Sequence, residues 1–472
     1  MSTITTTYRA PVPSPSAWRH TTRGAIAAWH CRIAYTTAWF VRAELLLGVL
    51  AGASLLVAVR AGALSAPEAQ GTALLVLLCR LAAYAAGRRA FVTSEGAAFF
   101  KCLVRSTALA ALAGTALALA WPAMAAPLPR AASLVLGSSV VSILLRWTTR
   151  GLIRRGRLVE DCLILGTTEK ATRFFDDLRA AQAGAVAPVA NGSLDGSCIV
   201  EFEHLRRLAQ QGSDSRLVVV EPPEDSQELH EVLLDCKVRG MAVEQAMDAY
   251  ERLAGRVWVE GLRPEWIVYG RGFRRPASHR AVKRALDLVA AVVLLSVTFP
   301  LLLLVALLVK LESPGPALFA QERVGENGRT FVLYKFRSMR SDAEAQSGPV
   351  WAGENDARIT PLGKVLRKCR LDELPQIWNV LRGEMSFVGP RPERPYFVDL
   401  LRQQIPYYDL RHYVTPGITG WAQVSYPYGA SIEDAYQKLQ YDLYYGKHMS
   451  LRFDIEVLVK TVSVVLMGRG AR

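Results

Sequence analysis

The sequence predicts a membrane protein that combines transmembrane α-helices with soluble α/β parts. Hydrophobic residues make up 51% of the 472 residues, a high share for a soluble protein. Four apolar segments come early in the chain, strand–helix alternation follows them, and one more apolar run precedes a soluble C-terminal portion. The expected parts, in order, are an N-terminal tail and basic flank (1–42), a four-helix transmembrane domain (43–150), a Rossmann-like α/β domain (151–272), a basic linker with a re-entrant membrane helix (273–312), and a compact α/β-type domain with C-terminal interfacial helices (313–472).

The four early apolar segments are predicted to cross a membrane. A span needs about 20 residues, so the second and fourth segments must extend at their edges. Arginine and lysine are frequent before the first segment, in the second loop and after the fourth segment, which places the N-terminus and the exit in the cytoplasm. The alternative is that these are buried helices of a soluble protein. The segments are Ala43–Val59, Thr72–Ala86, Leu103–Trp121 and Ala131–Leu145.

The net charge indicates which kinds of partner the protein binds, and the cysteines indicate the compartment of its soluble parts. A formal net charge of +14 favours anionic partners, and the membrane segments favour a lipid surface or a phosphorylated substrate over nucleic acid. The seven cysteines are scattered, without a Cys-x-x-Cys spacing, as is typical of reduced thiols in a cytoplasmic setting. We therefore expect the soluble parts to face the cytoplasm and to bind no nucleic acid.

Alternating strands and helices are predicted after the fourth apolar segment. Val159–Thr168 is predicted to be a strand that leads into a loop, and Arg216–Pro222 a second strand. Lys170–Ala181 and Gln227–Arg239 are predicted to be helices. This alternation predicts a parallel sheet. The loop at Gly166 lacks the second glycine that lets a backbone approach a pyrophosphate closely. A structural or regulatory role is therefore expected for this domain rather than dinucleotide binding.

The uncharged run Leu288–Val309 has basic residues at both ends and Pro300 near its middle. Positive charge on both sides argues against a simple crossing. Proline removes a helical hydrogen bond and kinks the chain. We expect a helix that enters the membrane, breaks at Pro300 and returns to the same face; a kinked span is the alternative. Leu451–Met467 is predicted to be an interfacial helix or a packing helix.

The acid pair Asp372-Glu373 lies among cationic residues on both sides in the sequence. Carboxylates among fixed cations favour phosphate chemistry with a metal ion. Adjacent acids are also common in the first turn of a helix, and Leu374–Leu381 could form that helix, with Pro375 in its first turn. The two interpretations are compatible, because a helix N-terminus also supplies donors for phosphate.

Three further patterns accompany the acid pair. The alternation in Thr330–Phe336 predicts a strand that projects Lys335 and Arg337 from one face. Arg391 stands between two prolines, which suits a pre-positioned fork for phosphate. Trp421 lies in a turn-rich loop, where it would either stack on a base or fill a core.

Taken in order, these motifs resemble the bacterial sugar transferases, the polyprenyl-phosphate hexose-1-phosphate transferases. The resemblance runs from about Arg280 to Arg472, and the segment around Pro300 also matches. With the upstream helices and α/β domain, the chain is similar to the large subgroup that starts exopolysaccharide, capsule or O-antigen synthesis. The matching motifs are Lys335–Met339, Leu371–Gln376, Gly389–Pro392 and Pro416–Gly420.

The resemblance implies a reaction and its participants. Undecaprenyl phosphate in the cytoplasmic leaflet of the bacterial inner membrane accepts a hexose-1-phosphate from UDP-glucose or UDP-galactose, with Mg²⁺, and UMP leaves. Asp372 matches the nucleophile, which forms a phosphosugar-aspartyl intermediate, and Glu373 matches its partner acid; both are candidate Mg²⁺ ligands. The other residues implied are Lys335, Arg337, Arg367 and Arg391 for the diphosphate, Thr419 and Trp421 for the nucleotide or substrate loop, and Pro300 for the helix break.

Two other classes of protein explain less of the sequence. A membrane-bound nucleotide-sugar dehydratase or epimerase needs a Tyr-x-x-x-Lys pair, which the sequence lacks. A non-catalytic scaffold or regulator of polysaccharide export explains the membrane helices but not four ordered motifs. The sequence does not fix the sugar, and a homodimer is a further expectation.

Overall fold

The structure is a computed structural model, and it divides the chain into two compact units, Met1–Ala254 and Gly255–Arg472. The four predicted transmembrane segments lie outside the described residues, apart from Leu144. The described residues are 25–34, 144, 148, 159–166, 168–182, 186–188, 197–212, 215–220, 227–270, 272–273, 276–340, 356, 358–426, 429 and 431–466.

The first unit contains a six-stranded sheet of order β3-β1-β2-β5-β6, in which β4 also pairs with β1. Strands β2, β5 and β6 run parallel, and helices connect them, so the predicted strand–helix alternation is confirmed for this part. Apolar side chains of β2 and β5 pack with α6 and α7 in one core. The elements are β1 (Ala25–Ala34), β2 (Val159–Leu165), α5 (Thr168–Gln182), β3 (Val186–Pro188), β4 (Ser197–Glu201), α6 (Phe202–Gln210), β5 (Arg216–Val219), α7 (Gln227–Val238), β6 (Ala242–Gln245) and α8 (Ala246–Ala254).

Strand β1 comes from the N-terminal flank, where no strand was predicted. It pairs antiparallel with β2, with Ala28 opposite Leu165, and also with β3 and β4. Four of its ten residues are alanine, which is depleted in strands, so the local sequence gives little sign of it. Backbone pairing with three other strands forms β1 instead. The flank 1–42 therefore contributes to the sheet of the Rossmann-like unit.

The boundary between the units lies at residues 254 and 255, earlier than the boundary at 272 expected from the sequence. The indole nitrogen of Trp421 donates to the carbonyl of Gly255 at 2.8 Å, and the amide of Val257 donates to that of Gln440 at 3.0 Å. Such contacts join distant parts of the chain and leave no local pattern. The segment that follows Gly255, with η2 (Val259–Gly261) and α9 (Pro264–Tyr269), thus belongs to the second unit.

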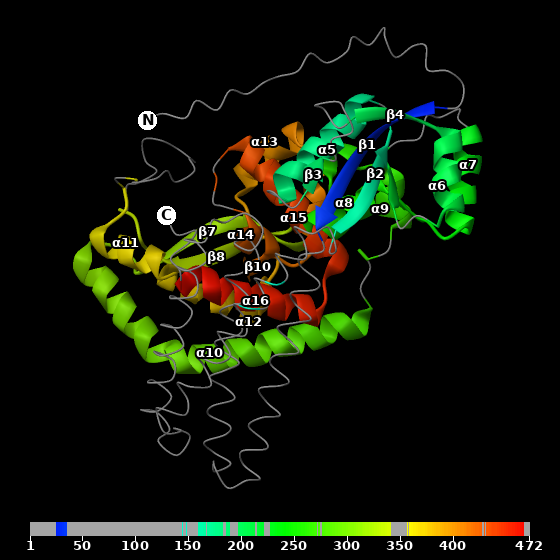
Figure 1. The fold of residues 1–472 in the computed structure, drawn as a ribbon. Coiled ribbons are helices and arrows are strands. Elements are labelled where there is room, and N and C mark those ends of the chain that lie inside the picture. The colour runs from blue at the N-terminus through cyan, green and yellow to red at the C-terminus, as the bar shows by residue number, and fades with distance from the viewer. Residues whose placement is uncertain are drawn as a thin grey trace. The chain divides into compact units, whose positions relative to one another are not determined.

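The second unit is bordered by one long helix, α10 (Ala277–Glu312), which contains Pro300 and is visibly bent (Figure 1). Among the described residues, it is the helix long and apolar enough to cross a membrane. A hairpin of two helices was expected, but the helix continues through the proline. The hydroxyls of Ser296 and Thr298 donate to the carbonyls of Val292 and Leu294, a pattern that bends helices.

Both limbs of α10 pack on the same body. Before the proline, Ala291 joins a buried cluster with Leu333 and Ile377. Beyond the proline, Val305 and Val309 join a second cluster, with residues of the strand and helix that precede the acid pair. The opposite side of the helix is apolar and exposed. Its exposed side chains include Val289, Val292, Val297, Phe299, Leu303, Leu307 and Leu311.

The body itself is built from a β-hairpin, a short parallel strand pair and helices. The predicted strand Thr330–Phe336 is confirmed as β8, which pairs antiparallel with β7. The remaining elements are β7 (Leu318–Val324), η3 (Glu326–Gly328), α11 (Pro361–Lys368), η4 (Leu371–Gln376), α12 (Ile377–Arg382), β9 (Ser386–Val388), α13 (Pro395–Gln404), η5 (Tyr408–Tyr413), β10 (Gly417–Thr419), α14 (Trp421–Ser425), α15 (Ile432–His448) and α16 (Leu451–Leu466).

Strands β9 and β10 bring two of the sequence motifs together. The amide of Gly389 donates to Thr419, and the amide of Gly417 donates to Pro390, each at 2.9 Å. A Cβ on Gly389 would lie 2.2 Å from the carbonyl oxygen of Thr415, so only glycine allows this approach. The loop that carries Arg391 is therefore fixed against the loop that contains Gly417.

Helix α16 has two faces. Val457 is buried in the cluster around Trp421, and the carboxylate of Asp454 is buried as well. Ile455 and Val462 are exposed. The helix thus packs on the body, as one alternative held, and it also presents apolar side chains outward.

Candidate active site

Asp372 and Glu373 lie in the 3₁₀ turn η4, which packs against β8 and α11. Both side chains are buried. Arg370 has φ 57°, which turns the chain sharply after α11. The helix expected over Leu374–Leu381 begins at Ile377 as α12, after this 3₁₀ turn. The acids therefore precede a helix, as predicted, but they belong to a separate turn.

Glu373 is held by three cationic side chains. Its Oε1 atom lies 2.9 Å from Arg391, 3.5 Å from Arg370 and 3.8 Å from Lys335. Burial raises the pKa of Glu373, but Arg391, Lys335 and Arg370 outweigh burial and lower this pKa to about 2. The carboxylate is thus a permanent anion at neutral pH, and it keeps the cations in place.

Asp372 differs from its neighbour. Its Oδ1 atom is buried and has no hydrogen-bond partner among the described residues. Burial raises the pKa of Asp372 and the negative charge of Glu373 raises it further, against the opposing effect of Lys335, Arg367 and Arg391. A buried polar atom without a partner is costly in a finished fold. Such an oxygen suits a group that attacks a substrate or binds a cation.

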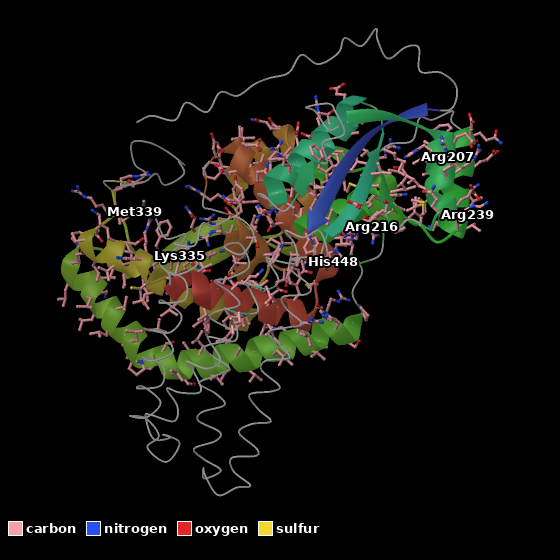
Figure 2. The ribbon with its side chains drawn as sticks, in the orientation of Figure 1. Arg207, Arg216, Arg239, Lys335, Met339 and His448 are labelled. Carbon is pink, nitrogen blue, oxygen red and sulfur yellow. The ribbon has the colours of Figure 1, made fainter. Side chains whose placement is uncertain are left out.

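Lys335 lies near the end of β8, and the motif that it begins ends at Met339 (Figure 2). Burial lowers the pKa of Lys335, the charge of Arg391 lowers it further, and the value falls to about 8 although Glu373 opposes the change. This lysine is therefore mostly charged at neutral pH and loses its charge in mild alkali.

Arg367 and Arg391 also belong to the site. The side chain of Arg367 donates to the hydroxyl of Ser338 at 2.9 Å, and its charge acts on Asp372. Arg391 contacts Glu373, as described above. Its backbone carbonyl accepts a 2.9 Å hydrogen bond from Arg411, whose guanidinium is buried in an ion pair with Asp442.

Sequence reasoning missed Arg411 and Asp442. Each lies in a helical segment outside the four motifs, and their pairing joins η5 to α15. Neither residue stands in a charge pattern that predicts burial. They hold the backbone of the Arg391 loop, whereas Glu373 contacts its guanidinium.

Arg337 was predicted to bind phosphate, but its contacts are different. Its terminal nitrogens donate to the carbonyls of Ser313 at 2.7 Å and Pro314 at 3.1 Å, at the C-terminal end of α10. The side chain is buried. Strand β8 ends at Phe336, so the alternation that puts Lys335 and Arg337 on one face does not extend to Arg337. This arginine caps the helix instead of facing the acids.

The side chains of Thr419 and Trp421 also contact other residues of the protein. The Trp421 ring lies 5.0 Å from that of Phe453, and the ammonium of Lys460 is 3.7 Å from the Trp421 ring centre. The hydroxyl of Thr419 shares a 2.7 Å hydrogen bond with that of Thr461. Of the two alternatives for Trp421, the core position is the one found.

The acids fit a metal ion only in part. Among the described residues, no group of three or more His, Cys, Asp or Glu side chains is placed to hold one. Mg²⁺ often binds through one or two carboxylates together with substrate phosphates. Asp372 offers an oxygen without a partner, whereas Oε1 of Glu373 is surrounded by cations. A magnesium site here thus depends on Asp372 and on the substrate's own oxygens.

The long apolar helix fits a membrane-associated protein, and a buried carboxylate among cations fits a site that binds phosphate groups. The family model of the bacterial sugar transferases matches residues 278–468. An exopolysaccharide production protein of Rhizobium leguminosarum is 42% identical over 195 residues, which cover 40% of this chain and 98% of that protein. The chain belongs to the bacterial sugar transferase family.

Two longer relatives carry more specific names. A UDP-N-acetylgalactosamine-undecaprenyl-phosphate N-acetylgalactosaminephosphotransferase of Aeromonas hydrophila is 44% identical over 241 residues, 51% of this chain and 56% of that protein. A UDP-glucose:undecaprenyl-phosphate glucose-1-phosphate transferase of Escherichia coli is 44% identical over 195 residues, 41% of this chain and 42% of that protein. The chain thus matches only about half of the length of these two relatives.

The position of Arg337 generates a prediction about stability. In Arg337→Met, the carbonyls at the end of α10 lose their donors, and unsatisfied buried groups cost about 1–3 kcal/mol each. We expect the thermal unfolding temperature of the purified protein to fall by several degrees. Arg329→Met, at an exposed turn, serves as the control and should leave the unfolding temperature unchanged. Equal unfolding temperatures for the two variants would contradict the capping role.

Proposed function

We propose that this protein transfers a hexose-1-phosphate from a UDP-sugar to undecaprenyl phosphate and so starts the synthesis of an exopolysaccharide, capsule or O-antigen. The observation that carries the proposal is the buried Oδ1 of Asp372, which has no hydrogen-bond partner among the described residues, beside a Glu373 held by cations. The family membership and the names of the relatives from Aeromonas hydrophila and Escherichia coli support the same reaction.

The first step is an attack by the Asp372 carboxylate on the phosphorus that bears the sugar. A new bond forms between the carboxylate oxygen and phosphorus, the bond from phosphorus to the bridging oxygen breaks, and UMP leaves with the electron pair. Lys335, Arg367 and Arg391 carry positive charge near this acid and would stabilise the charge that moves onto the leaving phosphate. Because Asp372 already lies among fixed cations, little reorganisation is required.

In the second step, an oxygen of undecaprenyl phosphate attacks the same phosphorus. The bond to Asp372 breaks, the free carboxylate is restored, and the lipid leaves as its diphosphate-linked sugar. Glu373 acts mainly through Arg391, Arg370 and Lys335, whose nitrogens lie 2.9, 3.5 and 3.8 Å from its Oε1. Mg²⁺, held by Asp372 and the substrate's diphosphate oxygens, would supply further neutralisation of phosphate charge.

The lipid substrate requires that the site lie at a membrane, and α10 supports a re-entrant arrangement. Near its start, Arg284 donates to the carbonyl of Leu381 at 2.8 Å; at its end, Ser313 accepts from Arg337 at 2.7 Å. Both ends are thus tied to one body, which supports their placement on the same side of a bilayer. The exposed apolar face along both limbs would enter the lipid and turn back at Pro300.

The pairing of β1 with β2 supports a cytoplasmic, multi-pass arrangement at the bacterial inner membrane. β1 precedes residues 35–158 and β2 follows them, yet the two strands lie side by side. This pairing supports the placement of residues 34 and 159 on the same side of a membrane. If the intervening segment crosses a bilayer, it crosses an even number of times, which agrees with four predicted spans.

The role of Asp372 generates the first functional prediction. Asp372→Asn removes the attacking carboxylate while keeping the size of the side chain. We expect UMP release to fall at least about 1000-fold, since an uncharged amide is a poor nucleophile. UMP release with undecaprenyl phosphate and a panel of UDP-glucose, UDP-galactose and UDP-N-acetylgalactosamine measures this and identifies the sugar. Unchanged turnover in a folded variant would refute the proposed role and favour a non-catalytic scaffold.

The pKa of Lys335 generates a pH prediction. This pKa is lowered to about 8, so the free protein loses a phosphate-binding cation as the pH rises through 8. The value of kcat/KM for the UDP-sugar, which reports the free enzyme, should fall above about pH 8. In Lys335→Arg the side chain stays charged, and this alkaline decline should disappear. A Lys335→Arg profile that overlays the profile of the unaltered protein would contradict the assignment.

The re-entrant arrangement can be tested with a membrane-impermeant maleimide. Arg280→Cys lies before the apolar run and Glu322→Cys lies beyond it, and both positions are exposed. In inside-out membrane vesicles both variants should label above the level of the parent chain, and in sealed spheroplasts neither should. Labelling of the two positions from opposite sides would instead show a kinked span.

A further inference from the structure

Strand β9 is held by side chains of the membrane helix. Lys283 and Asp287 lie one turn apart on α10 and therefore face the same way. The amide of Phe387 donates to Oδ1 of Asp287 at 3.3 Å, and the ammonium of Lys283 donates to the carbonyl of Val388 at 3.2 Å. A neighbouring strand would offer β9 a hydrogen-bond acceptor and a donor. Here Asp287 is the acceptor and Lys283 is the donor.

Asp454 of α16 joins this contact to a second donor. Its Oδ2 lies 2.7 Å from the Lys283 ammonium, and its Oδ1 lies 2.6 Å from the hydroxyl of Tyr445 on α15. The same hydroxyl is 3.1 Å from the carbonyl oxygen of Val388. The Lys283 ammonium thus donates to this carbonyl, and the single hydroxyl proton of Tyr445 is shared between Asp454 and the same carbonyl. We call Lys283, Tyr445 and Asp454 the anchor triad.

The held carbonyl belongs to the residue that leads into the Arg391 loop. Gly389 and Pro390 separate Val388 from Arg391, and Gly389 is fixed against the neighbouring loop by backbone contact. The prolines on either side of Arg391 restrict rotation of the backbone. The backbone between Val388 and Arg391 therefore has little conformational freedom, so a shift of Val388 would displace Arg391.

The energetics of the anchor triad favour a positioning role over a stabilising one. The side chains of Lys283 and Asp454 are only 12% and 11% exposed. A buried ion pair often adds little net stability, because loss of hydration offsets the attraction, and apolar residues of similar size can replace it without loss. What apolar residues cannot supply is a donor to the carbonyl of Val388.

We propose that Lys283, Tyr445 and Asp454 are positioning residues for Arg391, so that the seating of the membrane helix sets the geometry of diphosphate binding. This inference rests on the proposed function, because it assumes that Arg391 binds the substrate's phosphates. The anchor triad acts on Arg391 through the backbone between Val388 and Arg391.

The central test is the double variant Lys283→Met with Asp454→Leu. It replaces both members of the ion pair by apolar side chains, so neither charge remains buried without its partner. The thermal unfolding temperature should stay close to that of the parent chain. The value of kcat/KM for the UDP-sugar should fall about tenfold, with most of the loss in KM. Tyr445→Phe, which removes only the proton shared between Asp454 and the carbonyl of Val388, should give a smaller loss in the same direction.

Coupling to Arg391 separates positioning from general damage. In an Arg391→Lys background, where the forked contact is already lost, the double variant should lower kcat/KM by less than about twofold. Arg284→Met is the matched control, since Arg284 also ties α10 to backbone carbonyls, but to those of Val380 and Leu381 on α12. Its effect should be the same in both backgrounds.

The outcomes distinguish this inference from the proposed function. If the double variant lowers kcat/KM equally in the parent and Arg391→Lys backgrounds, or not at all, the positioning role is refuted even though Asp372→Asn is inactive. If the parent chain releases no UMP with any of the UDP-sugars, the proposed function itself fails. A double variant that cannot be folded while Tyr445→Phe keeps full activity would also overturn the inference.

Discussion

The structure of the site depends on one buried carboxylate, that of Glu373. Around its Oε1 atom, Arg391, Arg370 and Lys335 gather from three different segments of the fold, and without this anion their charges would repel one another in a poorly hydrated space. Glu373 compensates the positive charges of these three side chains. The neighbouring Asp372 can therefore lie among cations without forming an ion pair of its own. The two adjacent carboxylates therefore have different surroundings: Glu373 is held by cations, whereas Oδ1 of Asp372 has no hydrogen-bond partner among the described residues.

The other constraint is the attachment of α10 along both of its limbs. Apolar clusters on either side of Pro300 and polar contacts at either end fix the helix to the body that carries the acids. A proline alone permits a bend but does not specify its direction. Here the body specifies it, because the two limbs must reach two separate clusters. The exposed apolar face and the acid pair are thus parts of one rigid arrangement.

The sequence predicted the parts of this arrangement that have local patterns. Strand β8, the helices α5 and α7 and the apolar run of α10 follow from periodicity, and the acid pair follows from its charged neighbours together with the family resemblance. The contacts that were missed join distant segments. Arg337 turns to the end of α10, and Arg411 pairs with Asp442; no spacing rule predicts these partners. For Trp421 the sequence left two alternatives, and its contact with Phe453 decides for the core position. Strand β1 was missed for the same reason, since its alanines favour no strand until other strands flank it.

The antiparallel pairing of β1 with β2 has a consequence for how the chain is made. Strand β1 leaves the ribosome first, and residues 35–158 must be synthesised before its partner exists. Contacts of such long sequence separation form late, because the loop between them must close first. During that interval β1 lacks its β2 partner and presents an unpaired strand edge. The sheet can close only after residues 35–158 have been synthesised; if these residues cross a membrane as proposed, it can close only when both of their flanks lie on the same side.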